Sequence, residues 1–473
     1  MSGMDSRIPQ KVSALAQAIR EAGGRGLLVG GCVRDQLMGT QPKDWDLEVY
    51  GIEPARLREL LDSIGPLNVV GEAFTVYKLG SDLDVSLPRR ERKSGSGHRG
   101  FVIEGDPSMS IEEATRRRDF TINAILQDPL TSEIIDPFNG RQDIANRTLR
   151  AVSAETFAED SLRVLRAAQF AARFKFQIDP ATVELCRSIE LTDLPPERIW
   201  GELEKLLLLA ERPSVGLDWL QKLGVIEQLF PELKALMDVP QDPEWHPEGD
   251  VFVHTKLAVD RARELIADLP YPKQVTVMLG TLAHDFGKPA TTEFIEGRTR
   301  SRGHEEAGVA PAQSFLDRIN VHTLGGYDVR AQVIALVRDH LKPGEFFKKR
   351  NEVGDGAFRR LARKCELDLL YRVAKADSLG RNADDVPREQ WYDAEAQEWF
   401  IQRARELEIL ERPPEPLLMG RHLLELGLEP GPKIGEITKA VYEMQLDGRV
   451  VSLDDAKNMA KAILSTDSAD YTD

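Results

Sequence analysis

Three acidic residues stand at alternate positions in the segment 43–49: Asp44, Asp46 and Glu48. Residues two apart on a β-strand point to the same face, and the apolar residues between these acids would take the buried face. Carboxylates that gather on one face repel one another, so such groups usually hold a divalent cation. The segment therefore predicts a strand that presents a metal site, although a DxD pattern alone is most often a set of solvated side chains.

A glycine turn lies just before these acids. An apolar strand is predicted over residues 26–29, the turn at Gly30 and Gly31, and a short helix over residues 32–38. Backbone N–H groups at such a turn and at a helix N-terminus bind phosphate. A phosphate-binding turn beside a metal site predicts metal-assisted phosphoryl or nucleotidyl transfer.

The elements that position these residues belong to a long globular chain. The length of 473 residues corresponds to roughly three domains. A hydrophobic content of 41% and a charged content of 30% are typical of a soluble protein. The sequence shows no long apolar run and no signal segment, which predicts neither a membrane span nor secretion. The three cysteines lie far apart and form no CxxC pair, so we expect a reducing, cytoplasmic location.

The net charge of −16 argues against a protein coated with nucleic-acid-binding charge. Two basic patches, at residues 89–99 and 116–118, are nevertheless enough to bind nucleic acid locally. Charge runs are more often solvated faces. Both patches follow the acidic segment within one predicted domain, which favours binding.

The periodicity between these patches predicts a second acidic strand. Residues 76–87 alternate as one strand that places Asp82, Asp84 and Ser86 on one face. Residues 90–109 are rich in Gly, Ser and charge and are predicted as a mobile loop.

Further along, the pattern becomes helical from about residue 155, and the proline-containing stretch 239–249 is the best domain boundary. We therefore expect four parts. They are a mixed α+β head (1–154), a helical neck (155–240), a third domain (241–388) and a helical C-terminal region (389–473).

Five motifs follow one another in the order found in one enzyme family. They are LVGGCVRDQLMG (28–39), KDWD (43–46), RRRDFTINA (116–124), EDSLRVLR (159–166) and ERIWGELEKLLL (197–208). Together they resemble the class II tRNA nucleotidyltransferases, that is, the CCA-adding enzymes and the bacterial poly(A) polymerases. The resemblance implies a polymerase-β-like head, the substrates CTP and ATP, and tRNA as partner.

The resemblance also implies a role for each matching residue. Asp44 and Asp46 would hold Mg²⁺, Asp84 would be a third catalytic carboxylate, and Glu48 only a neighbour. Two ions about 3.5–4 Å apart can clamp the attacking 3′-hydroxyl and the leaving pyrophosphate. The expected nucleotide contacts are Gly31 and Arg34 at the triphosphate, Arg118 at the nucleotide, and Asp119 and Asn123 at the sugar.

Asp160, Arg163 and Arg166 would complete the nucleotide site by resemblance. Three residues apart on a helix, Asp160 and Arg163 would share a face, and the simpler interpretation is a surface ion pair. As a template, the carboxylate would accept from the exocyclic amine of cytosine or adenine while the guanidinium donates to the ring nitrogen. One departure is Gln169, where the family usually has a second arginine, and it puts part of the phosphate contact in doubt.

Six of the eight histidines lie within residues 246–340, far more than an even spread would give. An adjacent pair, His284 and Asp285, has distant partners in His254 and Asp377. Histidine and aspartate ligands on helices suit a transition metal or Mg²⁺. A single buried histidine is usually ordinary core, but a set of this kind is harder to dismiss.

This set resembles the HD phosphohydrolase superfamily, with its core positions at His254, His284, Asp285 and Asp377. The resemblance implies an HD domain that holds a divalent metal such as Ni²⁺ or Mg²⁺ and hydrolyses 2′-phosphates or 2′,3′-cyclic phosphates. Lys288 would contact a phosphate. His304 and His340 belong to the same histidine set without a core position, and His246 and His322 have no expected role.

The sequence thus predicts an α+β protein with a polymerase-β-like head, a mostly helical neck, an HD domain and a helical tail. The expected enzyme adds CCA to tRNA 3′ ends, with no membrane partner, as a monomer or homodimer. The long segment 90–109 favours full CCA addition over CC-only addition. A-only addition, a poly(A) polymerase, an HD phosphohydrolase with a degenerate head, and a non-catalytic RNA-binding protein remain alternatives.

Overall fold

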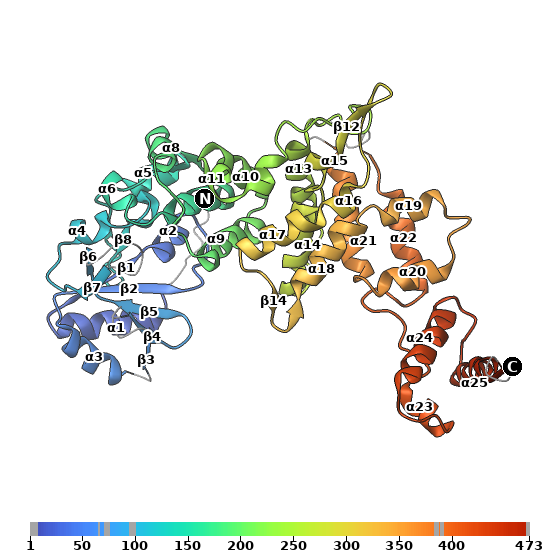
Figure 1. Cartoon of the computed structure of the whole chain (residues 1–473). Helices are drawn as coiled ribbons and strands as arrows, with labels where there is room; N and C mark the ends of the chain where they lie inside the picture. The colour runs from blue at the N-terminus through green and yellow to red at the C-terminus, as the bar shows by residue number, and fades with distance from the viewer. Residues whose placement is uncertain are drawn as a thin grey trace. The chain divides into compact units, whose positions relative to one another are not determined.

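The computed structural model describes residues 8–64, 67–70, 76–93, 101–382, 387 and 392–469 (Figure 1). Its internal contacts divide the chain into two compact units, unit 1 from Met1 to Leu229 and unit 2 from Phe230 to Asp473. The mixed α+β head and the helices that follow it confirm the predicted fold class. The division into four parts remains a prediction.

Unit 1 is built on a seven-stranded sheet with the strand order β3-β4-β5-β2-β1-β8-β9. Its central pairs are β1 with β2, which are antiparallel, and β2 with β5, which are parallel. The strands are β1 (Arg25–Val29), β2 (Trp45–Tyr50), β3 (Leu67–Val70), β4 (Val76–Leu79), β5 (Leu83–Ser86), β8 (Leu126–Gln127) and β9 (Ile134–Ile135).

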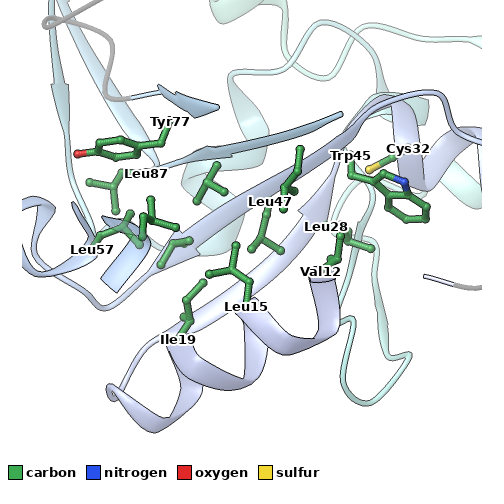
Figure 2. Close-up of a cluster of buried hydrophobic side chains, with 14 of the residues drawn as sticks. Val12, Leu15, Ile19, Leu28, Cys32, Trp45, Leu47, Leu57, Tyr77 and Leu87 are labelled. Carbon is green, nitrogen blue, oxygen red and sulfur yellow. The ribbon is translucent and has the colours of Figure 1, made fainter. Parts of the chain in front are cut away.

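The core of the head lies between this sheet and α1 (Gln10–Glu21), as Figure 2 shows. Val12, Leu15 and Ile19 recur at helical spacing and are fully or almost fully buried against Leu28 and Leu47 of the sheet. The predicted alternation of β2 is confirmed, because its apolar residues are buried while Asp46 is exposed on the opposite face. Burial of one face of β2 therefore fixes where its acidic face points.

The remaining elements of unit 1 are mostly helices. The helices are α2 (Gly31–Leu37), α3 (Pro54–Asp62), α4 (Ile111–Arg116), α5 (Gly140–Ala145), α6 (Ala154–Phe157), α7 (Leu162–Phe174), α8 (Pro180–Arg187), α9 (Pro196–Leu209), α10 (Pro213–Lys222) and α11 (Val225–Leu229), with a 3-10 turn, η1 (Thr121–Asn123). Two short ribbons are β6 (Arg89–Lys93) with β7 (Phe101–Gly105), and β10 (Thr148–Leu149) with β11 (Gln177–Ile178).

Two predictions about the head were wrong in detail. Residues 76–87 form the hairpin β4–β5 rather than one strand, because Gly80 turns the chain with a φ of +72° and leaves Asp82 in the turn. The predicted loop 90–109 is in part the paired ribbon β6–β7, since cross-strand hydrogen bonds order its two sides. Residues 94–100 of that loop lie outside the described residues.

Unit 2 is a helical body in which α13 packs against α21 and α14, and α14 against α18. Two hairpins interrupt the helical pattern predicted over residues 250–385, β12–β13 and β14–β15. Its elements are α12 (Pro231–Ala235), α13 (Val251–Glu264), α14 (Tyr271–Ala283), α15 (Lys288–Thr291), β12 (Thr292–Ile295), β13 (Arg298–Ser301), α16 (His304–Ala307), α17 (Val309–Arg318), β14 (Thr323–Leu324), β15 (Tyr327–Asp328), α18 (Val329–Asp339), α19 (Lys342–Lys348), α20 (Asp355–Ala362), α21 (Leu367–Gly380), α22 (Glu395–Glu406), α23 (Gly420–Glu425), α24 (Pro432–Leu446) and α25 (Leu453–Ala469).

The three cysteines are free and buried, one in α2, one in α8 and one between α20 and α21. Among the described residues, no helix combines the length and the hydropathy that a bilayer span requires.

Candidate active sites

The acidic face of β2 meets a second acid on the neighbouring strand. Asp46 and Asp84 are direct partners in the parallel pair β2–β5, so their side chains stand side by side on one face of the sheet. Asp44 precedes the first residue of β2 rather than belonging to the strand, and it is exposed. The structure therefore brings together Asp46 and Asp84, the two acids that the sequence placed on separate strands.

Asp46 carries the electrostatic cost of this arrangement. Loss of hydration raises the pKa of its carboxyl, and the charges of Asp84, Asp44 and Glu48 raise it further, while Arg118 opposes them. Mutual repulsion of this kind is relieved when a cation binds between the carboxylates. The donor set, all carboxylate oxygens, fits Mg²⁺.

Glu48 is held by its neighbours instead. The Tyr50 hydroxyl donates a hydrogen bond to Glu48, and the Arg118 guanidinium forms an ion pair with it at 3.6 Å. Its side chain is only 12% exposed. These contacts hold the Glu48 carboxylate in place. The sequence analysis expected Glu48 to lie beside the metal ligands without being one of them.

The glycine turn is conformationally special. Gly30 has a φ of +74° and a ψ of −130°, a combination that residues with a Cβ rarely adopt. A Cβ there would also lie 3.0 Å from Nη1 of Arg118. Glycine at this position therefore lets the Arg118 guanidinium lie over the turn, next to the N-terminus of α2.

Four polar side chains, of which three are buried, form a hydrogen-bonded chain from α2 to the neck. Arg34 donates from Nη1 to Oδ1 of Asn123 at 2.7 Å, and the Asn123 amide donates to Asp119 at 3.0 Å. Arg166 of α7 binds the other Asp119 oxygen with two hydrogen bonds of 2.9 and 2.7 Å. Oε1 of Glu202 lies 3.7 Å from Nη1 of the same Arg166. The residues predicted at the triphosphate and at the sugar are thus joined to Arg166 in one hydrogen-bonded unit, whereas Asp160 and Arg163 stand outside it.

The pKa of Asp119 reflects this chain. Burial alone would raise the pKa of Asp119, but the Arg166 guanidinium and the Asn123 amide hold it below its usual value. Arg34 is only 6% exposed at its side chain and lies over the Phe174 ring at 4.5 Å. Arg34 is therefore held in place by its neighbours, while it also lines the cavity beside the glycine turn, where its contact with the triphosphate was predicted.

Asp160 was predicted on the same helix face as Arg163, and this was wrong. The helix α7 begins at Leu162, so Asp160 precedes it and accepts a hydrogen bond from the backbone N–H of Leu162 at 3.2 Å. Its ion-pair partner is Arg198 of α9 at 2.8 Å, a residue that the sequence reasoning missed because it lies 38 positions away. Burial raises the pKa of Asp160, and Arg198 brings it below its usual value.

Arg163 is fixed by backbone carbonyls. Its guanidinium donates to the carbonyl of Thr156 at 2.5 Å and to that of Arg117 at 2.7 Å. Gln169 is fully buried within α7, and its amide oxygen and nitrogen have no hydrogen-bond partner among the described residues. The departure at Gln169 therefore lies in the interior of the neck and not on the surface of the nucleotide site.

Two cavities meet at Asp46. One of about 450 Å³ is lined by carboxylates and arginines from the sheet and the neck, and the other, of about 690 Å³, opens beside the glycine turn. The first contains Asp46, Asp84, Arg118, Asp119, Asp160, Arg163, Arg166 and Arg198, and the second contains Gly31, Arg34, Asp44, Asp46, Lys43 and Arg173. Among the residues predicted for the transferase site, only Asn123 lines neither cavity, because it is buried behind Asp119.

The second candidate site lies in unit 2, where the histidine set converges. Three triads place their ligand atoms within 4.8 Å of one another: His246, Glu248 and His254; His254, His284 and Asp285; and Asp285, His304 and His340. The predicted fourth ligand, Asp377, contacts Nε2 of His254 at 3.0 Å. Asp285 and His254 are shared between triads, so the cluster offers more than one position for a cation.

The histidines of this cluster share one orientation. In His284, His304 and His340, Nδ1 contacts the carbonyl three residues earlier at 2.6, 2.7 and 2.7 Å. In His254, Nδ1 contacts Glu248 at 2.6 Å. A partner on Nδ1 leaves Nε2 as the ligand atom, which is how metal-binding histidines are usually held.

Two observations indicate that these inward atoms fit a cation. Nε2 of His284 is buried and has no hydrogen-bond partner among the described residues. Nε2 of His304 and Nε2 of His340 face each other at 3.2 Å, and Asp285 lies 3.4 Å from the former. Lone pairs turned toward one another repel, so a positive ion between them would be stabilising. Mixed imidazole and carboxylate donors suit a transition metal.

Charge is concentrated in this cluster. The pKa values of Asp285 and Asp377 lie well below the usual range, because neighbouring histidines outweigh the effect of burial. Burial lowers the pKa of His254, but hydrogen bonds to Asp377 and Glu248 raise it to about 9. Burial and adjacent imidazoles lower the pKa of His340 to about 3. A metal would replace the proton on His254.

Sequence reasoning missed several members of this cluster. His304 and His340 were counted in the histidine set but not among its predicted metal ligands, and His246 was set aside, yet each belongs to a triad. Glu248 gave no sequence signal, because an isolated glutamate in a loop is common. The histidine spacing was the available signal, since His304 and His340 lie in the same stretch as the other ligands.

The turn after the histidine pair is tightly packed. A Cβ on Gly287 would lie 2.0 Å from the carbonyl oxygen of His304, so only glycine allows this close approach. Lys288 follows and contacts Asp285 at 2.8 Å and Gln241 at 2.7 Å. The cluster opens into a cavity of about 730 Å³ that also exposes Lys288.

Comparison with known proteins adds independent findings. Residues 27–150 match the Poly A polymerase head domain, and residues 175–237 match the probable RNA and SrmB-binding site of polymerase A. A multifunctional CCA protein of Xanthomonas campestris is 39% identical over 375 residues, covering 76% of this chain and 87% of its own. Its counterpart in Xylella fastidiosa strain M12 is 37% identical over 373 residues, covering 76% of this chain and 84% of its own.

Solved structures share the fold. The Thermotoga maritima CCA-adding enzyme complexed with tRNA has a TM-score of 0.60 at 20% identity, with 97% of each chain covered.

Proposed function

Because this chain belongs to the family of multifunctional CCA proteins, we propose that it adds CCA to tRNA 3′ ends from CTP and ATP. The observation that carries the proposal is the pairing of Asp46 with Asp84 at the edge of a cavity lined by arginines. The alternation of carboxylates and guanidiniums matches a nucleoside triphosphate with its metal ions. A relative in T. maritima was solved with tRNA, which supports the same substrate.

In this proposal each residue has a limited task. Asp44, Asp46 and Asp84 hold Mg²⁺, which activates the 3′-hydroxyl and stabilises the leaving pyrophosphate when bound. Arg118 contacts the nucleotide where it lies over the Gly30 turn. Asp119 orients Arg166 and, through Asn123, the helix that carries Arg34.

Base selection is assigned to Asp160 and Arg163, which line the same cavity. Arg198 binds one oxygen of Asp160, and each carboxylate oxygen has a second lone pair that can accept from an exocyclic amine. Guanine and uracil place a carbonyl there and leave the carboxylate unpaired. We therefore expect Asp160→Ala to incorporate incorrect bases more readily than the parent.

The test uses tRNA that lacks CCA, CA or A, incubated with each labelled nucleotide. Incorporation of C, C and A in turn supports full CCA addition. Incorporation of A alone or of C alone would identify a partial enzyme, and extension beyond CCA would identify a poly(A) polymerase. No incorporation into any of the three substrates would remove the proposal.

A second activity is proposed for unit 2, a metal-dependent phosphohydrolase that acts on 2′-phosphates or 2′,3′-cyclic phosphates. The inward-facing Nε2 atoms and Lys288, which is largely buried but lines the cavity, favour it. Release of phosphate from a 2′-nucleotide, or opening of 2′,3′-cyclic AMP, should require a divalent metal and the carboxylate of Asp285. Hydrolysis that is the same after Asp285→Ala would contradict the assignment.

A further inference from the structure

Helix α20 presents three arginines to the C-terminal helix α24. Arg359 and Arg360 lie in the last turn of α20, and Arg363 caps it. Arg363 follows the other two by four and three residues, so the three side chains share one side of the helix, which we call the arginine face. No residue of this face lines a cavity at either candidate active site. Neither proposed reaction therefore accounts for it.

Two acids at the end of α24 occupy the arginine face. Glu443 accepts hydrogen bonds from Arg360 at 3.0 Å and from Arg363 at 2.6 Å. Asp447 accepts a second hydrogen bond from Arg360, at 2.6 Å, and Arg363 lies over the Tyr442 ring at 5.2 Å. A guanidinium binds carboxylate and phosphate oxygens with the same forked geometry. The two acids therefore hold the arginines in the way that phosphate groups would.

Helix α24 itself gains nothing from these acids. Glu443 lies in its last turn and Asp447 is its C-terminal cap. Negative charge at this end of a helix opposes the helix dipole, and like charges four residues apart repel each other. Helix α24 is described along its whole length, and its last turn contains no basic residue to offset them. The arginine face, and not the stability of α24, therefore explains where these acids lie.

The contact between α20 and α24 is polar and can be undone. Helices α23 to α25 pack around a hydrophobic core of their own, and within the described chain no residue of α20 belongs to that core. Arg359 donates to the carbonyl oxygen of Leu446 at 2.8 Å, and a Cβ on Gly356 would lie 2.7 Å from Oδ1 of Asp447. Exposed ion pairs stabilise little and weaken in salt. A polyanion can therefore displace α24 without opening a hydrophobic core.

The surroundings of the arginine face are basic. Residues 338–364 contain nine lysines and arginines but four acids, in a chain whose net charge is −16. Residues 348–350 at the end of α19 are all basic and all exposed. Helix α19 packs against α20 through Phe346 and Phe358, whose ring centroids are 5.0 Å apart. A basic surface of this kind in an acidic protein attracts an extended polyanion.

We propose that the arginine face binds the sugar–phosphate backbone of an RNA strand, and that Glu443 and Asp447 occupy it until the strand displaces them. A strand carries one phosphate charge per nucleotide, so it can follow a row of arginines without fitting any particular side chain. Contacts of this kind position a nucleic acid and carry no sequence information. RNA binding and release of α24 are then one equilibrium. The inference goes beyond the proposed function, because it assigns a surface outside both active sites.

The test measures binding of a fluorescein-labelled uridine oligomer to the full chain in chelator, by fluorescence anisotropy. Replacement of all three arginines of the face by alanine should weaken binding about tenfold and reduce the slope of log affinity against log salt by about two, because three phosphate contacts are lost. Glu443→Gln combined with Asp447→Asn should strengthen binding about fivefold, because the strand no longer has to displace the two acids from three ion pairs.

The matched control removes the same charge elsewhere in the C-terminal region. Glu429 and Glu436 are exposed, and neither has an ion-pair partner among the described residues. Glu429→Gln combined with Glu436→Gln should change the affinity by less than about twofold, because salt screens charges that do not contact the strand. A gain equal to that of the Glu443 and Asp447 variant would show that only net charge matters, and would overturn the inference.

The decisive measurement combines the two sets of changes. In the variant without the three arginines, Glu443→Gln with Asp447→Asn should give no gain, since the acids have nothing left to occupy. A gain that persists there, or no gain when the arginines are present, contradicts the inference. Arg363→Ala alone, with its helix content checked by circular dichroism, should lose part of the gain, and it replaces the triple variant if that variant unfolds.

A competition experiment tests the class of partner. Unlabelled uridine oligomer should displace the labelled strand at far lower concentration than polyglutamate of equal charge, because the bidentate contacts are then to phosphate in a flexible strand. Equal competition would assign the arginine face to an acidic protein and overturn the RNA assignment. Binding in chelator requires no catalysis, so these results stand or fall separately from the proposed reactions.

Discussion

The two candidate sites differ in how far the protein alone has assembled them. In unit 2, three triads of ligand atoms already lie within 4.8 Å of one another, and the histidines turn Nε2 inward. In the described part of unit 1, no three such atoms come that close, although Asp46 and Asp84 are neighbours on the sheet.

This difference follows from the chemistry of the cations. Mg²⁺ is usually bound by one or two carboxylates together with the phosphates of the substrate, and rarely by a cage built of protein alone. In the proposed function, the transferase site would therefore be completed by the nucleotide, whereas the atoms of the histidine cluster are already arranged as they would be around an ion. The chain thus contains one carboxylate site that needs its substrate to complete the set of ligand atoms, and one histidine site that supplies these atoms from the protein alone.

The largest effect that we predict, and the strongest test of whether the two sites are separate, concerns Asp46. Asp46→Ala should lower nucleotide incorporation by about 10³-fold, because several kcal/mol of metal-dependent stabilisation is lost. Incorporation is measured with labelled CTP, and phosphate release by the same sample should be unchanged. Asp82→Ala, in the turn of the neighbouring hairpin where Asp82 pairs with Lys11, is the matched control and should keep incorporation. Equal loss of both activities would mean that the sites are not separate.

Asp285→Ala should have the reciprocal effect. Asp285 belongs to two triads, so its removal should abolish phosphate release, about 10³-fold or more, and lower the metal content of the purified protein. Incorporation into tRNA should persist. His322→Ala removes a half-exposed histidine outside the cluster and serves as the control. Metal content equal to that of the parent would show that Asp285 is not a ligand.

A metal exchange should sharpen the comparison further. After chelation, Mg²⁺ alone should restore incorporation, since oxygen donors suit it, but should restore phosphate release poorly. Ni²⁺, Co²⁺ or Mn²⁺ should restore phosphate release about 10²-fold better than Mg²⁺, because imidazole donors favour these ions. Full recovery of both activities with Mg²⁺ would contradict this histidine site.

The smallest predicted effect concerns stability and pH. Asp119→Asn removes the charge that pairs with Arg166, and because the Arg166 side chain is 31% exposed, we expect a loss of about 2 kcal/mol of unfolding free energy. Because the folded pKa of Asp119 lies below its unfolded value, this stabilisation is present above the unfolded pKa and is lost as pH falls through the folded one. The variant should therefore show a smaller fall in stability below about pH 4, measured by urea unfolding. An identical acid dependence would assign the stability to other groups.

The sequence predicted what depends on local patterns. Alternation placed Asp46 on the face opposite buried Leu47, and the structure confirms this because a strand repeats every two residues. The Asp160 prediction failed because helix boundaries depend on a few residues, and α7 begins at Leu162. The Arg198 contact could not be predicted, since it joins segments that only the packed neck brings together.

The same reasoning explains what was missed in unit 2. The histidine spacing indicated a metal site, but the share of His304 and His340 in it depends on the inward turn of each ring. The backbone carbonyl three residues earlier fixes the orientation of each ring. A sequence alone does not show which ring nitrogen that carbonyl contacts. Gln169 illustrates the opposite error. The sequence suggested that it affects a phosphate contact, but its side chain is fully buried in the interior.

The contact between His254 and Asp377 joins residues 123 positions apart. An ion that binds both in the folded chain, and neither in the unfolded chain, would hold these two distant segments together and stabilise the fold by mass action. At a free metal concentration of about 100 times the dissociation constant, such binding contributes roughly 2.7 kcal/mol. The metal that serves hydrolysis would then also govern how often this half of the chain opens to a protease, so the supply of metal in the cell would help set the lifetime of the protein.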